Sequence, residues 1–231
     1  MKVTYIFHSS FLVETEKHYL LFDYFKGDIP KMDPEKQLVV FVSHRHEDHF
    51  SPEIFKLSED YPKTEYVISD DIWEKRVPQE LFSKIQFIGP GEELEAAGLK
   101  VKAYKSTDEG VAFLVTVGGH TLFHAGDLNW WHWEGEDPGW NRNMEGNFKA
   151  YTQPLQGRQL DLAMLPLDPR LGRDGFRGPR YFLDLAKIRC MIPMHQWEDF
   201  GFTEQFLDAY PQYRGCVLPV AENGQVFSLE I

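Results

Sequence analysis

The sequence predicts an α/β fold in which two sheets are packed in layers with helices on the outside. Many short segments rich in β-branched and aromatic residues alternate with segments that carry helix-start signals. Residues 39–42 (Val-Val-Phe-Val) are apolar at every position, which is typical of a strand buried on both faces. Hydrophobic residues make up 42% of the 231 residues, enough for a sizeable core. No linker and no repeat of fixed period occurs, so we expect a single domain over residues 1–231.

The first half of the chain is predicted to consist mostly of strands. Polar breaks separate apolar segments at residues 3–7, 10–14, 19–23, 39–42, 66–69 and 84–88. Ser51 as an N-cap and Pro52 at the first helical position predict a helix over residues 51–60. A short helix capped by aspartate is expected over residues 70–76. Residues 94–95, 99–104, 111–117 and 121–124 predict antiparallel strands, with Gly118-Gly119 as a hairpin turn.

The second half repeats the order of strand, polar loop and helix. Strands are expected at residues 162–166, 190–193, 217–218 and 225–229, and helices at residues 181–187 and 203–210. Residues 128–147 contain four tryptophans and many charges, and they predict one long irregular loop. Loops of that length in a compact domain are usually functional or mobile.

Charge and hydropathy argue against nucleic acid as a ligand, against secretion and against a membrane span. With 36 acidic and 24 basic side chains, the formal net charge is −12, which argues against nucleic acid as a ligand. The first residues, Met-Lys-Val-Thr-Tyr-Ile-Phe-His, contain too short an apolar run for a signal peptide. No segment has the apolar length of a membrane span. We therefore expect a cytoplasmic protein that acts on a small molecule.

Residues 44–49 read His-Arg-His-Glu-Asp-His and are the densest cluster of metal-type ligands in the chain. Imidazole and carboxylate groups are the usual ligands of zinc and of similar divalent metals. So many polar groups on one short loop cannot all be buried without partners, so the loop is either a metal site or a very polar surface loop. In the metal interpretation, His44 and His46 face one ion, while Asp48 and His49 face a second.

Three further metal-type residues follow apolar strands. Asp23 ends the strand at residues 19–23, Asp127 follows the strand at residues 121–124, and His195 follows the strand at residues 190–193. Each has an ordinary interpretation by itself, as a turn residue, a helix cap or a satisfied polar side chain. Because polar residues at strand ends are where α/β proteins build their sites, we expect them to converge with the histidine loop at one sheet edge.

The order and separations of Asp23, the motif at residues 44–49, Asp127 and His195 resemble those of the metallo-β-lactamase superfamily of metallohydrolases over nearly the whole chain. Residues 8–13 (His-Ser-Ser-Phe-Leu-Val) are similar to the opening of the branch that contains ascorbate-6-phosphate lactonases, ribonuclease Z and N-acyl-phosphatidylethanolamine phospholipases. The resemblance implies a four-layer αβ/βα sandwich, with two mixed sheets, helices outside and two divalent metal ions at the sheet edges. Zinc is the metal to expect, with manganese and iron as alternatives.

The resemblance also implies roles for individual residues. His44 and His46 would bind the first metal, Asp127 would bridge both metals, and Asp23 would support the site from behind through hydrogen bonds. The second metal would be bound by Asp48, His49 and His195.

One element of the family is missing. Where relatives place a third histidine ligand of the first metal, this chain reads Lys105-Ser106-Thr107-Asp108-Glu109-Gly110, and Thr107 stands in the place of the histidine. Asp108 or Glu109 could supply a carboxylate instead, which would favour manganese or iron over zinc. Alternatively, the first metal is weakly bound or absent. We include Asp108 among the predicted ligands.

An intact site predicts hydrolysis. Bound divalent metal lowers the pKa of water toward neutrality and stabilises oxyanion charge. Asp48 is then expected to hold or deprotonate the water as well as to bind metal. The predicted function is cleavage of a small ester, lactone, amide or phosphoester. The alternative is a metal-binding protein without turnover, acting as a sensor, a redox module or a degenerate scaffold.

Four residues are candidates for contact with the substrate. Trp131 and His132 lie in the tryptophan-rich segment after Asp127, where they could stack on an apolar or ring substrate; packing over the core is the alternative. Arg170 could clamp a phosphate or carboxylate, or else form an internal ion pair with Asp168 or Asp174. His8 could act as a proton donor, or be an ordinary polar residue at a strand end.

Overall fold

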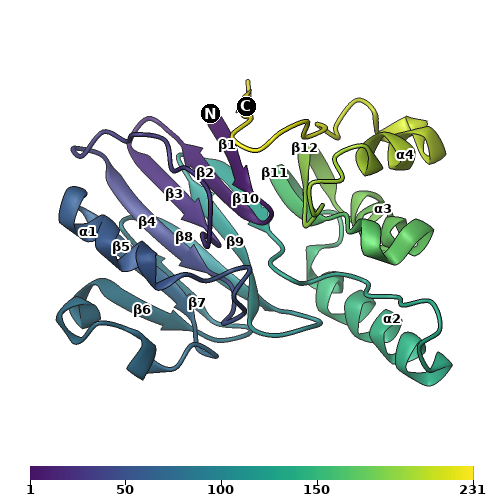
Figure 1. Cartoon of the computed structure of the whole chain (residues 1–231), viewed down its shortest axis with the longest axis horizontal. Coiled ribbons are helices and arrows are strands. Elements are labelled where there is room, and N and C mark those ends of the chain that lie inside the picture. The colour runs from purple at the N-terminus through teal and green to yellow at the C-terminus, as the bar shows by residue number, and fades with distance from the viewer. Residues whose placement is uncertain (231) are drawn as a thin grey trace.

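In the computed structural model, which describes residues 1–230, the strands form two mixed sheets that face each other (Figure 1). The seven-stranded sheet has the order β13-β1-β2-β3-β4-β5-β6, and the six-stranded sheet has the order β12-β11-β10-β9-β8-β7. The strands are β1 (Lys2–Phe7), β2 (Ser10–Glu14), β3 (His18–Phe22), β4 (Gln37–Val42), β5 (Thr64–Ser69), β6 (Ile85–Ile88), β7 (Glu93–Ala96), β8 (Leu99–Lys105), β9 (Val111–Val117), β10 (His120–His124), β11 (Gln159–Pro166), β12 (Lys187–Met194) and β13 (Val226–Ser228).

Helices cover the outer face of each sheet. The 3₁₀ helix η1 (Pro52–Lys56) and the helix α1 (Leu57–Asp60) pack on the first sheet, while α2 (Pro138–Thr152), α3 (Arg177–Leu185) and α4 (Phe202–Ala209) lie on the side of the second sheet (Figure 1). Further 3₁₀ segments are η2 (Glu74–Arg76), η3 (Gln79–Lys84), η4 (Gln153–Leu155), η5 (Pro169–Phe176) and η6 (Pro211–Tyr213). The predicted α/β sandwich of two mixed sheets with helices outside is therefore confirmed.

Strand β4 shows why a run of apolar residues was needed. Val39 and Phe41 point into the core between the two sheets, whereas Val40 and Val42 pack under η1 and α1. All four side chains are buried, because successive residues of a strand point to opposite faces and both faces of this sheet are covered. The side chains of Ile54 and Phe55 complete the outer layer of the first sheet.

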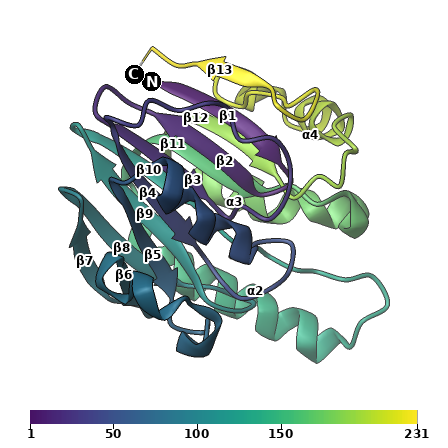
Figure 2. The same cartoon turned by 60° about the vertical axis from the view of Figure 1, so that its left-hand side comes forward.

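The two ends of the described chain lie in one sheet. Strand β13 pairs antiparallel with β1, with Val3 opposite Phe227, and Figure 2 shows the two strands side by side. The hairpin turn predicted at Gly118-Gly119 is present between β9 and β10, and both glycines have positive φ angles of 57° and 86°. No helix within residues 1–230 combines the length and the apolar character that crossing a membrane requires.

Four local predictions were wrong. The strand predicted at residues 217–218 is only an isolated bridge between Val217 and Met191. The segment 128–147 is not one irregular loop, because α2 begins at Pro138, where the Asp137 side chain accepts hydrogen bonds from Gly139 and Trp140 N–H groups. The buried side chains of α2 recur every three or four residues, which is the spacing of one helix face, at Asn141, Met144, Phe148 and Thr152. Residues 70–76 contain only η2, without an aspartate cap. The helix predicted at residues 181–187 is α3, which ends at Leu185, and Lys187 already belongs to β12.

The strands that carry the predicted site end at the same edge of the sandwich. Strands β3 and β4 run parallel, as do β10, β11 and β12, so their carboxyl ends meet there. The two sheets are joined at this edge by main-chain hydrogen bonds, from Val111 N–H to the Ser43 carbonyl at 2.9 Å and from His195 N–H to the His8 carbonyl at 3.2 Å.

Two glycines allow the chain to close around Ser43 at this edge. Gly110 and Gly126 have positive φ angles of 63° and 52°. A Cβ atom at Gly110 would lie 2.0 Å from the Ser43 carbonyl oxygen, and one at Gly126 would lie 2.8 Å from the Ser43 side chain. Residues with a side chain are therefore excluded from both positions by the backbone conformation and by lack of space.

Candidate metal centre

The loop after β4 places its polar side chains at two depths. His44 and His49 are fully buried, whereas the His46 side chain is 40% exposed and the Asp48 side chain is 31% exposed. A tight turn produces this arrangement, in which the His49 and Phe50 N–H groups both donate to the His46 carbonyl at 3.0 Å. The sequence argument that this loop could not be wholly buried is consistent with this division.

Asp127, in the turn after β10, lies between the buried imidazoles. Its Oδ2 atom is 3.4 Å from His44 Nε2. Its Oδ1 atom is 3.2 Å from His49 Nε2 and 3.4 Å from His195 Nε2. The two oxygens of one carboxylate thus face different histidines, and the arrangement fits the bridging role that the resemblance implies for Asp127.

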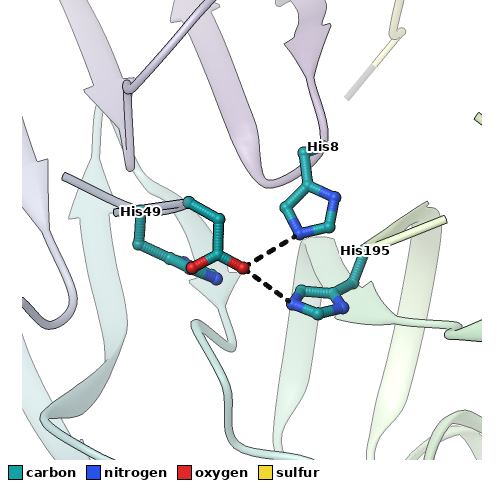
Figure 3. A group of neighbouring side chains, drawn as sticks. His8, His49 and His195 are labelled. Carbon is teal, nitrogen blue, oxygen red and sulfur yellow. Dashed lines mark ion pairs between the residues drawn. The ribbon is translucent and has the colours of Figure 1, made fainter. Parts of the chain in front are cut away.

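Asp48 faces the other side of the same cluster. Asp48 Oδ2 lies 3.6 Å from His8 Nε2 and 3.8 Å from His195 Nε2. Figure 3 shows the rings of His8 and His195 directed toward the same point. His8 comes from the end of β1 in one sheet, and His195 from the end of β12 in the other. The loop at residues 44–49, Asp127 and His195 are therefore brought together with His8.

The cluster has buried donor and acceptor atoms that no neighbour satisfies. Within residues 1–230, the Nε2 atoms of His8, His44, His49 and His195 and the Oδ1 atom of Asp127 have no hydrogen-bond partner. Leaving such groups unpaired in a protein interior is costly, at about 1–3 kcal/mol each. All five atoms belong to the kinds of ligand that divalent metals bind. Two groups whose ligand atoms lie within 4.8 Å of one another meet here, namely His8, Asp48, His49 and His195, and His44, His46 and Asp127. The residues present therefore fit divalent metal.

Asp23 lies behind the histidines, on the side away from the cavity atoms. The carboxylate is fully buried and lies 2.7 Å from His49 Nδ1. It also accepts hydrogen bonds from the Ser43 N–H at 2.7 Å and the Ser43 hydroxyl at 2.5 Å. The Ser43 Oγ atom is in turn 2.9 Å from His44 Nδ1. Asp23 therefore orients His49 directly and His44 through Ser43. Sequence reasoning missed Ser43, although its position at the end of a buried strand was a signal.

Asp168 has the corresponding role for His195 and was not predicted as a site residue. Its buried carboxylate lies 2.8 Å from His195 Nδ1 and accepts hydrogen bonds from Nε and Nη2 of Arg170. Arg170 is thus in the ion pair that the sequence left open as an alternative to substrate binding. The guanidinium also lies 4.5 Å from the ring centre of Trp197. The signal in the sequence was that Asp168, like Asp23 and Asp127, follows an apolar strand.

Electrostatics at the centre favour charged carboxylates. Burial alone would raise the pKa of Asp127, but the neighbouring His49 and His195 imidazoles hold that pKa well below its ordinary value. Burial would lower the pKa of His49, but Asp127 and Asp23 hold it well above its ordinary value. In the absence of metal, a proton on His49 therefore offsets part of the negative charge. A metal ion would displace this proton on binding.

Thr107, which stands in the place of the missing histidine, is hydrogen-bonded to the main chain of Asn129. The Thr107 hydroxyl donates to the Asn129 carbonyl at 2.7 Å and accepts from the Asn129 N–H at 3.0 Å. The next two side chains turn toward His46, with Asp108 Oδ2 3.8 Å from His46 Nδ1 and Glu109 Oε2 3.3 Å from His46 Nε2. Burial and the charge of Asp127 raise the pKa of Asp108. Glu109 Oε1 is paired with Arg45, and its Oε2 atom is buried without a hydrogen-bond partner within residues 1–230, whereas Asp108 lines the cavity at the centre.

A cavity of about 250 Å³ opens onto the centre. Its lining combines the polar residues His46, Asp48, Asp108, Asp127, Arg170 and His195 with the apolar and aromatic residues Trp131, Trp133, Trp140 and Met144. Trp131 lines the cavity and also belongs to the buried core, and its indole N–H donates to the Asp127 carbonyl at 2.9 Å; its contact with a substrate stays a prediction. His132 is not part of this lining and lies 3.9 Å from Asp174.

Comparisons with known proteins agree with this geometry. Residues 2–132 match the model of the beta-lactamase superfamily domain. A UPF0173 metal-dependent hydrolase from Pyrococcus abyssi is 26% identical over 212 residues, which cover 84% of each chain. Among solved structures, the metallo hydrolase Igni18 from Ignicoccus hospitalis superposes with a TM-score of 0.65 at 18% identity, covering 99% of both chains. The diiron beta-hydroxylase CmlA from Streptomyces venezuelae gives a TM-score of 0.67 at 11% identity, covering 99% of this chain and 54% of CmlA.

The structural similarities show the fold, and the family match covers more than half of the chain. They establish the family that the motif predicted. The chain belongs to the beta-lactamase superfamily, in its metallo-β-lactamase form.

Proposed function

We propose that this protein is a metal-dependent hydrolase that cleaves a small ester, lactone, amide or phosphoester. The observation that carries the proposal is the set of buried, unpartnered ligand atoms on His44, His49, Asp127 and His195 beneath a cavity. The relatives named as metal-dependent hydrolases support it as well. Bound divalent metal would supply a hydroxide nucleophile near neutral pH and would stabilise negative charge on the substrate oxygen.

The chain offers ligands for two ions. We propose that His44, His46, Asp108 and Asp127 hold one, that Asp48, His49 and His195 hold the other, and that Asp127 bridges them. Zinc suits the imidazole-rich second group. The extra carboxylate from Asp108 makes the first group more suitable for manganese or iron, and the diiron centre of CmlA shows that this fold accepts iron.

Asp48 is the group best placed to handle a proton. Its carboxylate lines the cavity and is partly exposed, so it can accept a hydrogen bond from the attacking water. Burial would raise its pKa, but the neighbouring His8 and His49 imidazoles hold the pKa well below the ordinary value. Asp48 therefore remains an anion across the physiological pH range and is available as an acceptor.

The cavity wall favours a substrate with an apolar or ring-shaped part. Trp131 and Trp133 are stacked with their ring centres 6.4 Å apart, and Trp140 is 39% exposed at the same cavity. Aromatic faces of this kind bind apolar groups and rings by stacking. The bond to be cleaved would face the carboxylates and imidazoles of the same lining.

Metal content together with a substrate panel tests this proposal. Protein purified without chelator should contain up to two equivalents of divalent metal per chain and should hydrolyse one class of the ester, lactone, amide and phosphodiester panel. His46→Ala should abolish turnover, and chelation should lower the melting temperature, because metal that binds only the folded chain stabilises it.

The second candidate function is metal binding without turnover, which Thr107 at the place of a ligand favours. Two results together would support this alternative and contradict the hydrolase. The protein would hold one equivalent of metal or less after supply of zinc, manganese and iron, and it would hydrolyse no member of the panel.

A further inference from the structure

His8 is held rigidly at the metal centre by an unusual backbone conformation. It has a φ angle of 56°, in the left-handed region that residues other than glycine rarely adopt, and His195 has a φ angle of 64°. The His195 N–H donates to the His8 carbonyl at 3.2 Å, so the two strained residues are linked directly across the two sheets. Such strain persists only where the surrounding structure enforces it, and it is commonest at functional sites.

The side chain of His8 is directed at the same point as the ligands of the second metal. Its ring lies 4.1 Å from the ring of His195, and its Nε2 atom lies 3.6 Å from Asp48 Oδ2 (Figure 3). The ligand atoms of His8, Asp48, His49 and His195 all lie within 4.8 Å of one another. Ligands that share one tetrahedral zinc ion at about 2.1 Å are about 3.4 Å apart, so these separations suit a shared ion.

Neither ordinary role explains His8. A structural histidine would have its ring nitrogen hydrogen-bonded, but Nε2 of His8 is buried and has no such partner within residues 1–230. A proton donor to the substrate would have to reach the cavity, but His8 is 3% exposed and is not among the residues that line it. Among the described residues the Nε2 atom of His8 has no hydrogen-bond partner, the ring is buried, and Nε2 faces Asp48. These are the properties of a metal ligand.

We propose that His8 is a further protein ligand of the second metal, beside Asp48, His49, His195 and the bridging Asp127. This inference rests on the proposed metal centre and goes beyond the ligands that the family resemblance implies. It makes the two metal positions unequal. The second position then has five protein ligands, whereas the first has four, His44, His46, Asp108 and Asp127, with Thr107 in the place of the family's third histidine. The first equivalent of metal should therefore fill the position of His8, and the second equivalent should bind more weakly.

Titration of the chelator-treated protein with Co²⁺, followed by visible absorption and by metal content after gel filtration, tests this assignment. The variant to compare is His8→Asn, because asparagine tolerates the left-handed backbone and its shorter side chain cannot replace Nε2. Loss of a residue that merely orients a ligand costs about 10–100-fold in metal affinity, so loss of a ligand should cost at least as much. We expect the first Co²⁺ to bind at least about tenfold more weakly and its absorption spectrum to change.

His124→Gln is the matched control, since His124 is equally buried but both of its ring nitrogens are hydrogen-bonded, to the Ser9 carbonyl and to the Gly126 N–H. It should bind the first Co²⁺ as the wild type does. His46→Asn should weaken only the second equivalent. If folded His8→Asn binds the first Co²⁺ with wild-type affinity and spectrum, His8 is not a ligand. If the wild type binds no metal, the proposed metal centre fails together with this inference.

A measurement on the unaltered protein guards against misfolding of the variant. With one equivalent of Co²⁺ bound, each coordinated histidine gives one strongly shifted imidazole N–H signal in the proton NMR spectrum. Three such signals are expected from His8, His49 and His195. Two signals would overturn the assignment, whatever the variant does.

Discussion

Nδ1 of His195 lies 2.8 Å from Oδ2 of Asp168, and the same carboxylate is held by the guanidinium of Arg170. The ring of His195 is thereby oriented so that its Nε2 atom faces both Asp127 and Asp48. A carboxylate behind a histidine ligand fixes its orientation and raises its basicity. The orientation of His195 Nε2 toward the proposed metal site therefore depends on the Asp168–Arg170 ion pair. This pair lies some 40 residues after Asp127 in the chain.

Replacing Asp168 should weaken metal binding without removing a ligand. Asp168→Asn keeps the size of the side chain but removes the charge that orients His195, and the affinity for the first equivalent of Zn²⁺ should fall about 10–100-fold. Competition with a zinc-binding dye measures this affinity. Asp174→Asn is the matched control, because Asp174 pairs with Arg177 rather than with a histidine of the cluster. Equal affinities for the two variants would contradict the positioning role of Asp168.

Asp168 should also make the stability of the metal-free protein depend on pH. Burial alone would raise its pKa, but the hydrogen bonds from His195 and Arg170 lower it to about 2. The unfolded chain has an aspartate pKa of about 3.9, so the folded state is stabilised above that pH and loses this contribution as pH falls toward 2. Urea unfolding with chelator should show the advantage of wild type over Asp168→Asn shrinking by about 2 kcal/mol between pH 6 and pH 2. Parallel pH curves would refute this.

Ser43→Ala should lower stability and loosen the first metal position. The hydroxyl is fully buried and connects Asp23 with His44 Nδ1, so its removal leaves two buried polar groups with one partner fewer. We expect the free energy of unfolding to fall by about 1–3 kcal/mol. Metal content should show the second equivalent weakened more than the first, because His44 belongs to the first metal position. Ser51→Ala, at the exposed start of η1, should leave both equivalents unchanged.

Trp140→Ala tests the aromatic wall of the cavity. The indole is 39% exposed and lines the cavity, so its loss should remove contact with substrate but little core packing. For whichever substrate the panel identifies, KM should rise about 5–30-fold, equivalent to about 1–2 kcal/mol of lost binding, while kcat and melting temperature change little. Exposed Trp73→Ala, outside this cavity, is the control. An unchanged KM would show that the substrate binds elsewhere.

The sequence by itself determined the layers of the fold and most of the ligands. The unbroken apolar run of β4 predicted burial on both faces of the strand. Ser51-Pro52 predicted the start of η1, because capping is a local interaction. The histidine loop was recognisable because its ligands are adjacent in sequence. Asp23, Asp127 and His195 were recognisable because strand ends in a layered fold converge on one edge. The helix α2 was missed because the tryptophans and charges around Asp137 concealed its buried face.

Only the tertiary structure decided which of these side chains contact one another. Asp168 and His195 are 27 residues apart, His8 and His195 are far apart in the chain, and no local pattern relates either pair. Their contacts arise when two sheets pack and bring the ends of β1, β11 and β12 together, with the His195 N–H closing onto the His8 carbonyl. Spacing in sequence sets which residues can share a strand or a turn, whereas burial, orientation and the unpaired nitrogen of His8 exist only after the sheets have packed.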